Sequence, residues 1–275
     1  MGKTSDDVHL LSRLRELLGI NKHKPSTEGL RKVIAAFIQR VPFENVSKLY
    51  YRKKYGLRMI PDLERYVDGI EQHNFGGTCY SNNQYLYRLL HHLGYDVRLC
   101  GADMNRPDVH LTVMVVVEGR EFLCDAGYGA PFLEPLPRDL DHDHVVALGN
   151  EQYILRPQDE RGYSRVDHVR DGEIIHGYTT KPMHREVDFF AEAFAHSCSD
   201  DGAFMNQLMV ARFWPGRSLV IRNLNVIRSE GLEVDIQKLG RREQIPSIVE
   251  EHVGIDREIV AEAVADLSDL SGMPV

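Results

Sequence analysis

The spacing of apolar residues predicts a helical first third of the chain. The segment VHLLSRLRELLGI has leucines at 10, 11, 14, 17 and 18, close to the period of an amphipathic helix, and Gly19 is placed to end it. A second helical pattern runs over 28–37 and is ended by Pro42, because the residue before a proline is disfavoured in a helix. A third covers 80–93 and is closed by Gly94. We therefore expect the first 95 residues to be mostly helical.

Beyond residue 95 the pattern changes to short runs of β-branched and aromatic residues. The runs lie at 97–100, 111–117, 120–124, 153–155, 165–168 and 173–175. Turn signals separate them, so we expect an antiparallel sheet or barrel in the middle third. From Val187 the segment VDFFAEAFAHS is helical again, strands are predicted at 207–213 and 218–221, and the end of the chain is helical. With 275 residues, the chain is expected to form two or three compact units.

Composition and charge exclude several classes of protein. Apolar residues make up 43% and charged residues 27%, which is typical of a globular protein rather than a disordered or fibrous one. The net charge of −8 argues against nucleic-acid binding, which usually needs a basic face. No run approaches the roughly 20 apolar residues that cross a bilayer, and the N-terminus has no apolar signal-peptide core. We therefore expect a cytoplasmic protein that binds neither nucleic acid nor a membrane.

Four cysteines lie at 79, 100, 124 and 198. No CxxC pair occurs, so nothing predicts a zinc or thioredoxin-type site, and the thiols are expected to stay reduced. The run DHDH at 141–144 resembles a metal cluster but is better explained as a polar loop, so no metal is predicted. Cys100 and Cys124 lie in strand patterns and are interpreted as core residues, whereas Cys198 lies in a polar stretch and is expected to be exposed.

The stretch FGGTCYSNN, residues 75–83, places Cys79 on a turn before a predicted helix. Gly76 and Gly77 permit the close approach of backbone that a nucleophile turn needs. The helix directs its free N–H groups and dipole toward the sulfur, which favours a thiolate. A free cysteine is nonetheless more often a small core residue, and the stretch itself contains no charged residue. A catalytic role therefore needs a base and an orienting group from elsewhere in the chain.

The segment HLTVMVVVEGREFLCDAGYG supplies both groups. It predicts a hairpin with a two-residue turn at Glu118-Gly119, in which the numbers of paired residues add up to 237. Asp125 then faces Thr112, and His110 lies two residues farther along on the same face, about 7 to 8 Å from Asp125 at the backbone. Taken singly, His110 could be a hydrogen-bonded sheet histidine and Asp125 a turn residue. Their shared face is what favours a catalytic pair, since a three-residue loop would place them on opposite faces.

These segments together resemble those of the arylamine N-acetyltransferases. VPFEN at 41–45, GGTCYSNN at 76–83, DAGYG at 125–129 and FMNQLMVAR at 204–212 are similar to segments of that family and follow the same order. GGTCYSNN is similar to the family signature GGxCxExN, and DAGYG to the family's DVGFG turn. Each segment alone is a weak signal, and their order along nearly the whole chain is what makes the match specific.

The resemblance implies a fold and a reaction. The fold would be α+β with a cysteine-protease-like core, formed by a helical bundle over 1–95, an antiparallel β-barrel over 96–186 and an α/β lid over 187–275. The reaction would be a ping-pong transfer of an acetyl group from acetyl-CoA, through a cysteine thioester, to an arylamine, arylhydroxylamine or hydrazine. The catalytic triad implied by the match is Cys79, His110 and Asp125. The residues that match the acceptor pocket are Phe43, Tyr128 and Phe204.

The chain departs from the family pattern at three places. Ser81 stands where the signature has a glutamate, Phe75 stands where an arginine usually precedes the two glycines, and the segment 98–109 is shorter than usual. The missing charges would have flanked the nucleophile, and the short loop borders the cofactor entrance in the family. Two alternatives therefore stay open at this point: an amide synthase-like acyltransferase that uses another acyl donor, and a non-catalytic binding homologue. The sequence carries no prediction of oligomeric state.

Overall fold

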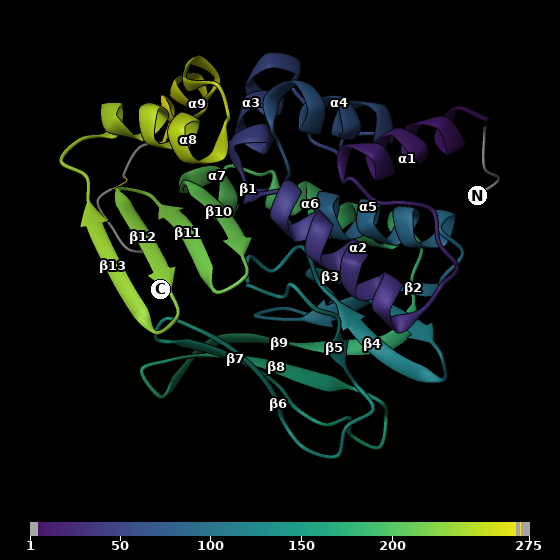
Figure 1. The fold of residues 1–275 in the computed structure, drawn as a ribbon. Helices are drawn as coiled ribbons and strands as arrows, with labels where there is room; N and C mark the ends of the chain where they lie inside the picture. Colours follow the sequence, from purple (N-terminus) through teal and green to yellow (C-terminus); the bar gives the residue numbers. More distant parts are fainter. Residues whose placement is uncertain (1–4, 268–269, 271–275) are drawn as a thin grey trace.

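The computed structural model describes residues 5–267 and residue 270, and Figure 1 shows a layer of helices above an antiparallel barrel, with a second sheet to one side. The first third is mostly helical, as predicted. It forms α1 (Ser5–Leu17), α2 (Thr27–Arg40), α3 (Val46–Tyr55), α4 (Leu63–His73) and α5 (Cys79–His92). The sequence pattern predicted α1, α2 and α5 but not α3 or α4. Helix α3 ends in the cationic run 52–54, and its apolar face is short, which explains why its pattern is weak.

Local signals fix the ends of these helices. The Ser26 side chain caps α2 by accepting a hydrogen bond from the backbone N–H of Gly29 at 3.0 Å. The Asp62 carboxylate caps α4 through the backbone N–H of Arg65 at 2.8 Å, and α4 ends at Asn74, whose φ of 54° is left-handed. The turn into α5 follows immediately, so the end of α4 sets the place of the FGGTCYSNN stretch.

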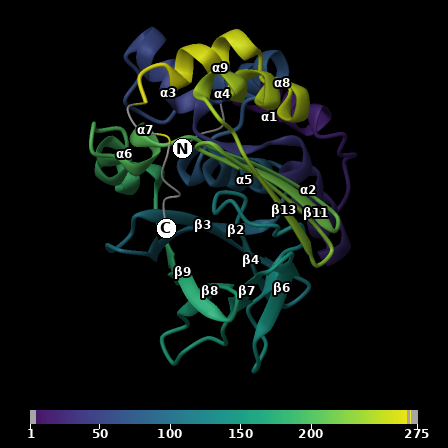
Figure 2. The ribbon, with the colours of Figure 1, turned by 90° about the vertical axis from the view of Figure 1, so that its left-hand side faces the viewer.

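The middle third forms an eight-stranded antiparallel sheet that is nearly closed into a barrel. Its strands are β2 (Asp96–Asp103), β3 (His110–Val117), β4 (Arg120–Cys124), β5 (Leu136–Pro137), β6 (His144–Leu148), β7 (Glu151–Leu155), β8 (Ser164–Arg170) and β9 (Glu173–His184). The strand order is β5-β4-β3-β2-β9-β8-β7-β6, so β5 and β6 are the two edges. All six predicted strands are confirmed, and β5 and β6 are short strands that the pattern did not predict. Figure 2, turned by 90°, shows this barrel below the helices.

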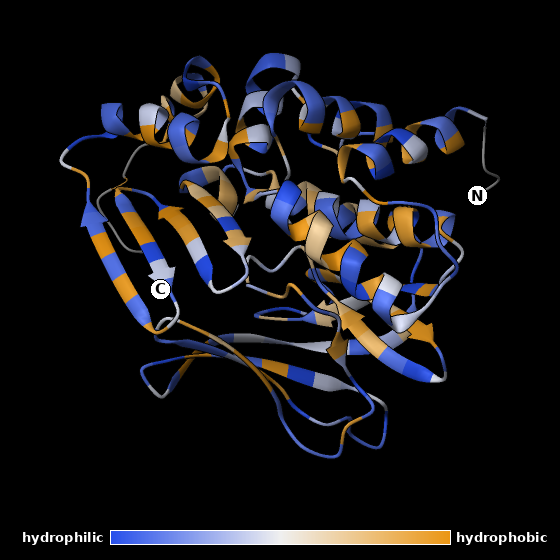
Figure 3. Cartoon of the chain, viewed as in Figure 1, coloured by the Kyte–Doolittle hydropathy of each residue, from blue (hydrophilic) through white to orange (hydrophobic). Residues whose placement is uncertain are grey.

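The last third forms a second sheet, covered by helices. It contains η1 (Val187–Phe190), α6 (Ala191–Ser197), α7 (Ala203–Asn206), β10 (Met209–Trp214), β11 (Arg217–Arg222), β12 (Asn225–Glu230), β13 (Glu233–Lys238), η2 (Arg242–Gln244), α8 (Ile245–Val253) and α9 (Arg257–Val264). Strands β12 and β13 were not predicted, because polar residues fill much of both strands and the outer strand β13 is largely exposed. Figure 3 shows the alternation of apolar and polar residues along these strands.

The helical first third is tied to the last third by a short strand and by shared packing. Strand β1 (Phe43–Glu44), which lies between α2 and α3, pairs with β10 at the edge of the second sheet. Helix α3 packs with β10, β11, α8 and α9 in one hydrophobic cluster, whereas α1, α2, α4 and α5 share a cluster with the barrel. The three-part division of the chain at residues 95 and 186 stays a prediction, and the two clusters do not follow it. Among residues 5–267 and 270, no helix combines the length and apolar character needed to cross a membrane.

Candidate active site

Cys79 is the first residue of α5 and lies on a turn that is fixed from both sides. A side chain at Gly76 would place its Cβ 1.9 Å from the backbone oxygen of Pro42, so only glycine fits there. The backbone N–H of Gly76 donates to the Glu44 carboxylate at 2.9 Å, and the backbone N–H of Glu44 donates to the oxygen of Gly77 at 3.1 Å. Strand β1 therefore holds the backbone that leads into Cys79, whose thiol is buried.

His110 and Asp125 come together on the β3–β4 hairpin as its predicted geometry requires. The turn residues Glu118 and Gly119 have φ angles of 53° and 74°, and Val117 pairs with Arg120, so the two-residue turn and its register are confirmed. His110 lies at the start of β3, and Asp125 follows the last residue of β4. The His110 Nε2 atom lies 2.7 Å from the Asp125 Oδ2 atom, and both side chains are buried.

The electrostatics of this pair favour the ionised form of both groups. Burial alone would lower the pKa of His110, but the charge and hydrogen bond of Asp125, together with the Cys79 thiol, raise it to about 10. Burial would raise the pKa of Asp125, but His110, Asn83 and Tyr178 outweigh it and hold that pKa below its usual value. Because Nε2 of His110 is occupied by Asp125, Nδ1 is the ring nitrogen that remains for the hydrogen bond with Cys79. The structure thus brings the three predicted triad residues into contact.

Asn83 is a site residue to which the sequence pattern gave no role. It lies one helical turn after Cys79, and its Nδ2 atom donates to Asp125 Oδ1 at 2.7 Å and to the backbone oxygen of Leu111 at 2.5 Å. Its Oδ1 atom accepts from the backbone N–H of Ala126 at 2.8 Å. This asparagine therefore joins α5 to the carboxylate end of the hairpin. The spacing of four residues on one helix face is the signal that could have found it.

Gly127 allows the DAGYG turn to lie directly against Cys79. A Cβ atom at this position would be 2.4 Å from Cys79 Cα and 2.7 Å from the Asn83 Nδ2 atom. Its backbone N–H also donates to Asp125 Oδ1 at 2.9 Å. The first glycine of the DAGYG segment is thus explained by close packing of two backbones, and not by a turn conformation.

The three predicted pocket residues divide into two groups. The rings of Phe43 and Phe204 meet edge to face with centroids 5.7 Å apart. Tyr128 lies on the barrel side, where its ring is edge-on to His110 at 5.9 Å and its hydroxyl is 2.7 Å from His176 Nδ1. The structure therefore places Tyr128 beside His110, and Phe43 and Phe204 beside each other at the edge of the second sheet. Their role in binding an acceptor stays a prediction.

Phe75 and Ser81, two of the three departures from the family pattern, are buried and uncharged. Phe75 packs against Tyr50, Tyr51 and His73, with ring centroids 5.0 to 5.8 Å away. The nearby Glu44 carboxylate is fully buried, burial raises its pKa, and its hydrogen bonds come from backbone N–H groups, including that of Ser47 at 2.8 Å. An aromatic cluster thus fills the space beside the nucleophile turn, and the buried carboxyl group is satisfied by the backbone.

The short segment before His110 is held by ion pairs. The Lys181 ammonium on β9 lies 2.6 Å from Asp103 and 2.9 Å from Asp108, and the backbone N–H of Asp108 donates to Asp103 at 2.8 Å. These contacts close a tight loop between β2 and β3, which fixes the approach of the chain to His110.

The other three cysteines are buried, and the DHDH run at 141–144 forms an ion pair with a neighbouring segment. Burial raises the pKa of Cys100 to about 12 and raises that of Cys124 further, as expected of core thiols. The prediction that Cys198 is exposed is wrong, because the turn after α6 folds it against α3 and leaves it 2% exposed. Within the DHDH run, Asp143 pairs with Arg156 at 2.6 Å. Among the described residues, no group of three or more His, Cys, Asp or Glu side chains is arranged to hold a metal ion.

Comparison with known proteins gives one consistent result. A family model described as N-acetyltransferase matches residues 26–261. Arylamine N-acetyltransferase 1 of Oryctolagus cuniculus is 28% identical over 186 residues, which cover 62% of this chain and 61% of that protein. A pineal gland arylamine N-acetyltransferase of Gallus gallus, isozyme NAT-10, is 35% identical over 121 residues, which cover 41% of this chain and 40% of that protein. The matches thus span less than two thirds of these curated relatives.

The folds of solved structures match the fold of this protein over nearly the whole chain. The arylamine N-acetyltransferase from Mycobacterium abscessus aligns with a TM-score of 0.78 at 17% identity, over 97% of this chain and 100% of that one. The enzyme from Mycobacterium marinum in complex with CoA aligns with a TM-score of 0.77 at 20% identity, over 94% and 100%. These likenesses confirm the predicted fold class of helical bundle, barrel and lid. Since the family model covers most of the sequence as well, the chain belongs to the arylamine N-acetyltransferase family.

Proposed function

We propose that this protein transfers an acetyl group from acetyl-CoA to an arylamine, an arylhydroxylamine or a hydrazine through a thioester on Cys79. The observation that carries the proposal is the contact of a buried thiol with an imidazole that is itself bonded to a buried carboxylate. This is the arrangement that activates a nucleophilic cysteine. The relative that was solved in complex with CoA supports a coenzyme A thioester as the donor.

In the first half-reaction, the Cys79 thiolate attacks the carbonyl carbon of the acetyl thioester. A bond forms between the Cys79 sulfur and the acetyl carbon, and the bond from that carbon to the coenzyme A sulfur breaks. The leaving thiolate takes the proton of the His110 imidazolium and departs as free coenzyme A. Asp125 keeps its charge and holds the His110 ring in place throughout this step.

In the second half-reaction, the nitrogen of the acceptor attacks the carbonyl of acetyl-Cys79. The carbon–sulfur bond to Cys79 breaks, and neutral His110 takes the proton that the acceptor nitrogen loses. This restores the thiolate and the imidazolium, so protons balance over the cycle. The aromatic side chains of Phe43, Tyr128 and Phe204 suit a flat acceptor, since flat rings pack well against other rings.

The proposal is tested by the intact mass of the protein after incubation with acetyl-CoA and no amine. We expect a gain of about 42 Da, one acetyl group on a cysteine nucleophile. The gain must disappear in Cys79→Ala and persist in Cys198→Ala, a matched change at another buried cysteine. Addition of an arylamine such as aniline should then remove the acetyl group and release the N-acetyl product.

The absence of any mass gain in a protein that is folded by circular dichroism contradicts the proposal with acetyl-CoA as donor. The same measurement with other acyl-CoA thioesters then separates the two remaining interpretations. Acylation of Cys79 by another donor identifies an acyltransferase with a different acyl group, and no acylation by any donor identifies a binding protein.

A further inference from the structure

A half-buried lysine on α3 lies beside the turn that leads into Cys79, without a carboxylate partner among the described residues. The Nζ atom of Lys48 donates to the backbone oxygen of Ser197 at 2.8 Å and to the Ser197 hydroxyl at 2.9 Å. The Cys198 thiol lines the same cavity as Lys48. The Ser197 carbonyl and hydroxyl are neutral groups, so the ammonium charge is held in place but not compensated by an ion pair.

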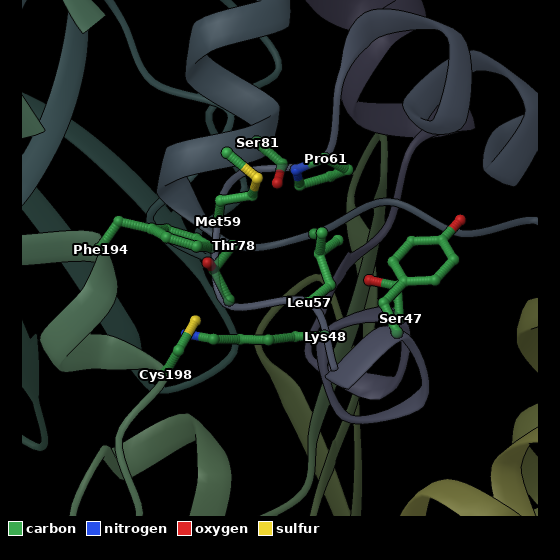
Figure 4. A pocket seen from close by; sticks show the side chains of 11 residues that line it. Ser47, Lys48, Leu57, Met59, Pro61, Thr78, Ser81, Phe194 and Cys198 are labelled. Carbon is green, nitrogen blue, oxygen red and sulfur yellow. The ribbon is translucent and has the colours of Figure 1, made fainter. Parts of the chain in front are cut away.

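Lys48 shares a cavity with the residues that lead into Cys79. The residues that line the cavity include Lys48, Cys198, Gly77, Thr78 and Ser81, and Figure 4 shows the Lys48 amine beside the Cys198 sulfur. The chain of contacts continues through aromatic rings. Lys48 Nζ lies 5.3 Å from the centre of the Phe194 ring, and that ring meets the ring of Tyr80, the neighbour of Cys79, edge to face at 5.3 Å.

The charge of Lys48 responds to the thiols around it. Burial lowers the pKa of Lys48, while the Cys198 and Cys79 thiols both oppose that effect and Arg52 adds to it. Such coupling is mutual: an ammonium that is favoured by a thiolate favours that thiolate in return. The geometric basis of this coupling is the cavity that Lys48 shares with Thr78 and Ser81, which lie on either side of Cys79 in the sequence.

This charge lies where the nucleophile stretch has none of its own. Phe75 and Ser81 are uncharged, and the FGGTCYSNN stretch contains no ionised side chain apart from a Cys79 thiolate. We propose that Lys48, across the cavity from the residues that flank Cys79, is a positioning residue that stabilises the Cys79 thiolate electrostatically. The inference rests on the proposed role of Cys79 as the nucleophile, and it adds a second cation to that role.

The charged and titratable groups that face Cys79 come from several elements. His110 on β3 and Asp125 after β4 act directly, through the imidazolium and carboxylate pair. Burial raises the pKa of Tyr80 on α5, the Cys79 and Cys198 thiols add to this rise, and Arg106 in the loop before β3 opposes it. These groups are unchanged when Lys48 is substituted, so a shift in the titration of Cys79 can be attributed to the lysine.

The test is the rate at which iodoacetamide alkylates Cys79, measured by peptide mass spectrometry from about pH 5 to about pH 10, a range that spans the usual thiol pKa. Every variant also carries Cys198→Ala, so that the second thiol in the cavity does not consume the reagent. Lys48→Met keeps the length of the side chain and removes its charge. Lys48→Arg restores a charge, and Lys53→Met removes a charge from the same helix at a residue that pairs with Asp266 at 3.1 Å.

We expect Lys48→Met to move the alkylation midpoint upward by about one pH unit and to slow alkylation about tenfold below that midpoint, since one neighbouring charge typically has an effect of this order. Lys48→Arg should recover most of the rate, and Lys53→Met should match the parent. A purely structural role would lower the melting temperature without moving the midpoint. Superimposable profiles for the parent and Lys48→Met, or no recovery in Lys48→Arg, overturn the inference.

The alkylation assay contains neither acetyl-CoA nor amine, so it separates this inference from the proposed function. A shifted profile in a protein that acetyl-CoA does not acylate supports the role of Lys48 and contradicts the proposed donor. An unshifted profile in a protein that is acylated contradicts the role of Lys48 and leaves the proposed transfer supported.

Discussion

Asn83→Ala removes the side chain that joins helix α5, which begins at Cys79, to the hairpin that carries His110 and Asp125. Three hydrogen bonds are lost, and their partners are the Asp125 carboxylate, the Leu111 carbonyl and the Ala126 N–H. A buried hydrogen bond to a charged group contributes about 1.5 to 3 kcal/mol and one to a neutral group about 1 kcal/mol. The free energy of unfolding should therefore fall by about 3.5 to 5 kcal/mol.

The same substitution should change the response to acid. Asn83 is one of the groups that hold the pKa of Asp125 low, so its removal raises that pKa. A carboxylate whose pKa is lower in the folded state than in the unfolded state stabilises the fold above the unfolded pKa, and this contribution is lost as the pH falls through the folded pKa. Because the folded pKa is higher in the variant, its acid unfolding should begin at a higher pH than that of the parent.

Urea denaturation at neutral pH, followed by circular dichroism and repeated at several acidic pH values, measures both effects. Asn105→Ala is the matched control, since Asn105 is exposed in the loop before β3 and is expected to change the free energy by less than about 0.5 kcal/mol. A loss below about 1 kcal/mol in Asn83→Ala would refute the reasoning, because it would show that the three bonds are replaced by water or by relaxation of the hairpin.

Two further substitutions test the geometry of the triad. Gly127→Ala puts a methyl group 2.4 Å from Cys79 Cα, so the turn must move. We expect the rate of Cys79 acetylation to fall about a hundredfold. Gly240→Ala is the control and should leave the rate unchanged, because its Cβ would meet nothing closer than 3.6 Å. Asp125→Asn keeps the size of the side chain but loses the charge that orients His110, and the rate should fall by about 10⁴ as in triads generally. A loss below about tenfold would remove Asp125 from the mechanism.

The sequence alone predicted the relation between His110 and Asp125 because that relation is local. A two-residue turn fixes the parity of a hairpin, and parity decides which side chains share a face. The same logic of short-range signals found α1, α2, α5 and six strands of the barrel. These signals did not predict α3, because its apolar face is short and is followed by a run of charged residues. They did not predict β12 and β13 either, because exposed polar residues interrupt the alternation of apolar and polar residues along these strands.

The surroundings of Cys79 are the part that only the tertiary structure decided. The polar flanks of Cys198 predicted an exposed thiol, but α6 turns that residue inward against α3, where it meets Lys48. Lys48 lies 31 positions before Cys79 and about 150 before Cys198, and no local pattern links positions so far apart. Periodicity determines which face of an element is buried, whereas the packing of separate elements determines which charge lies beside the sulfur.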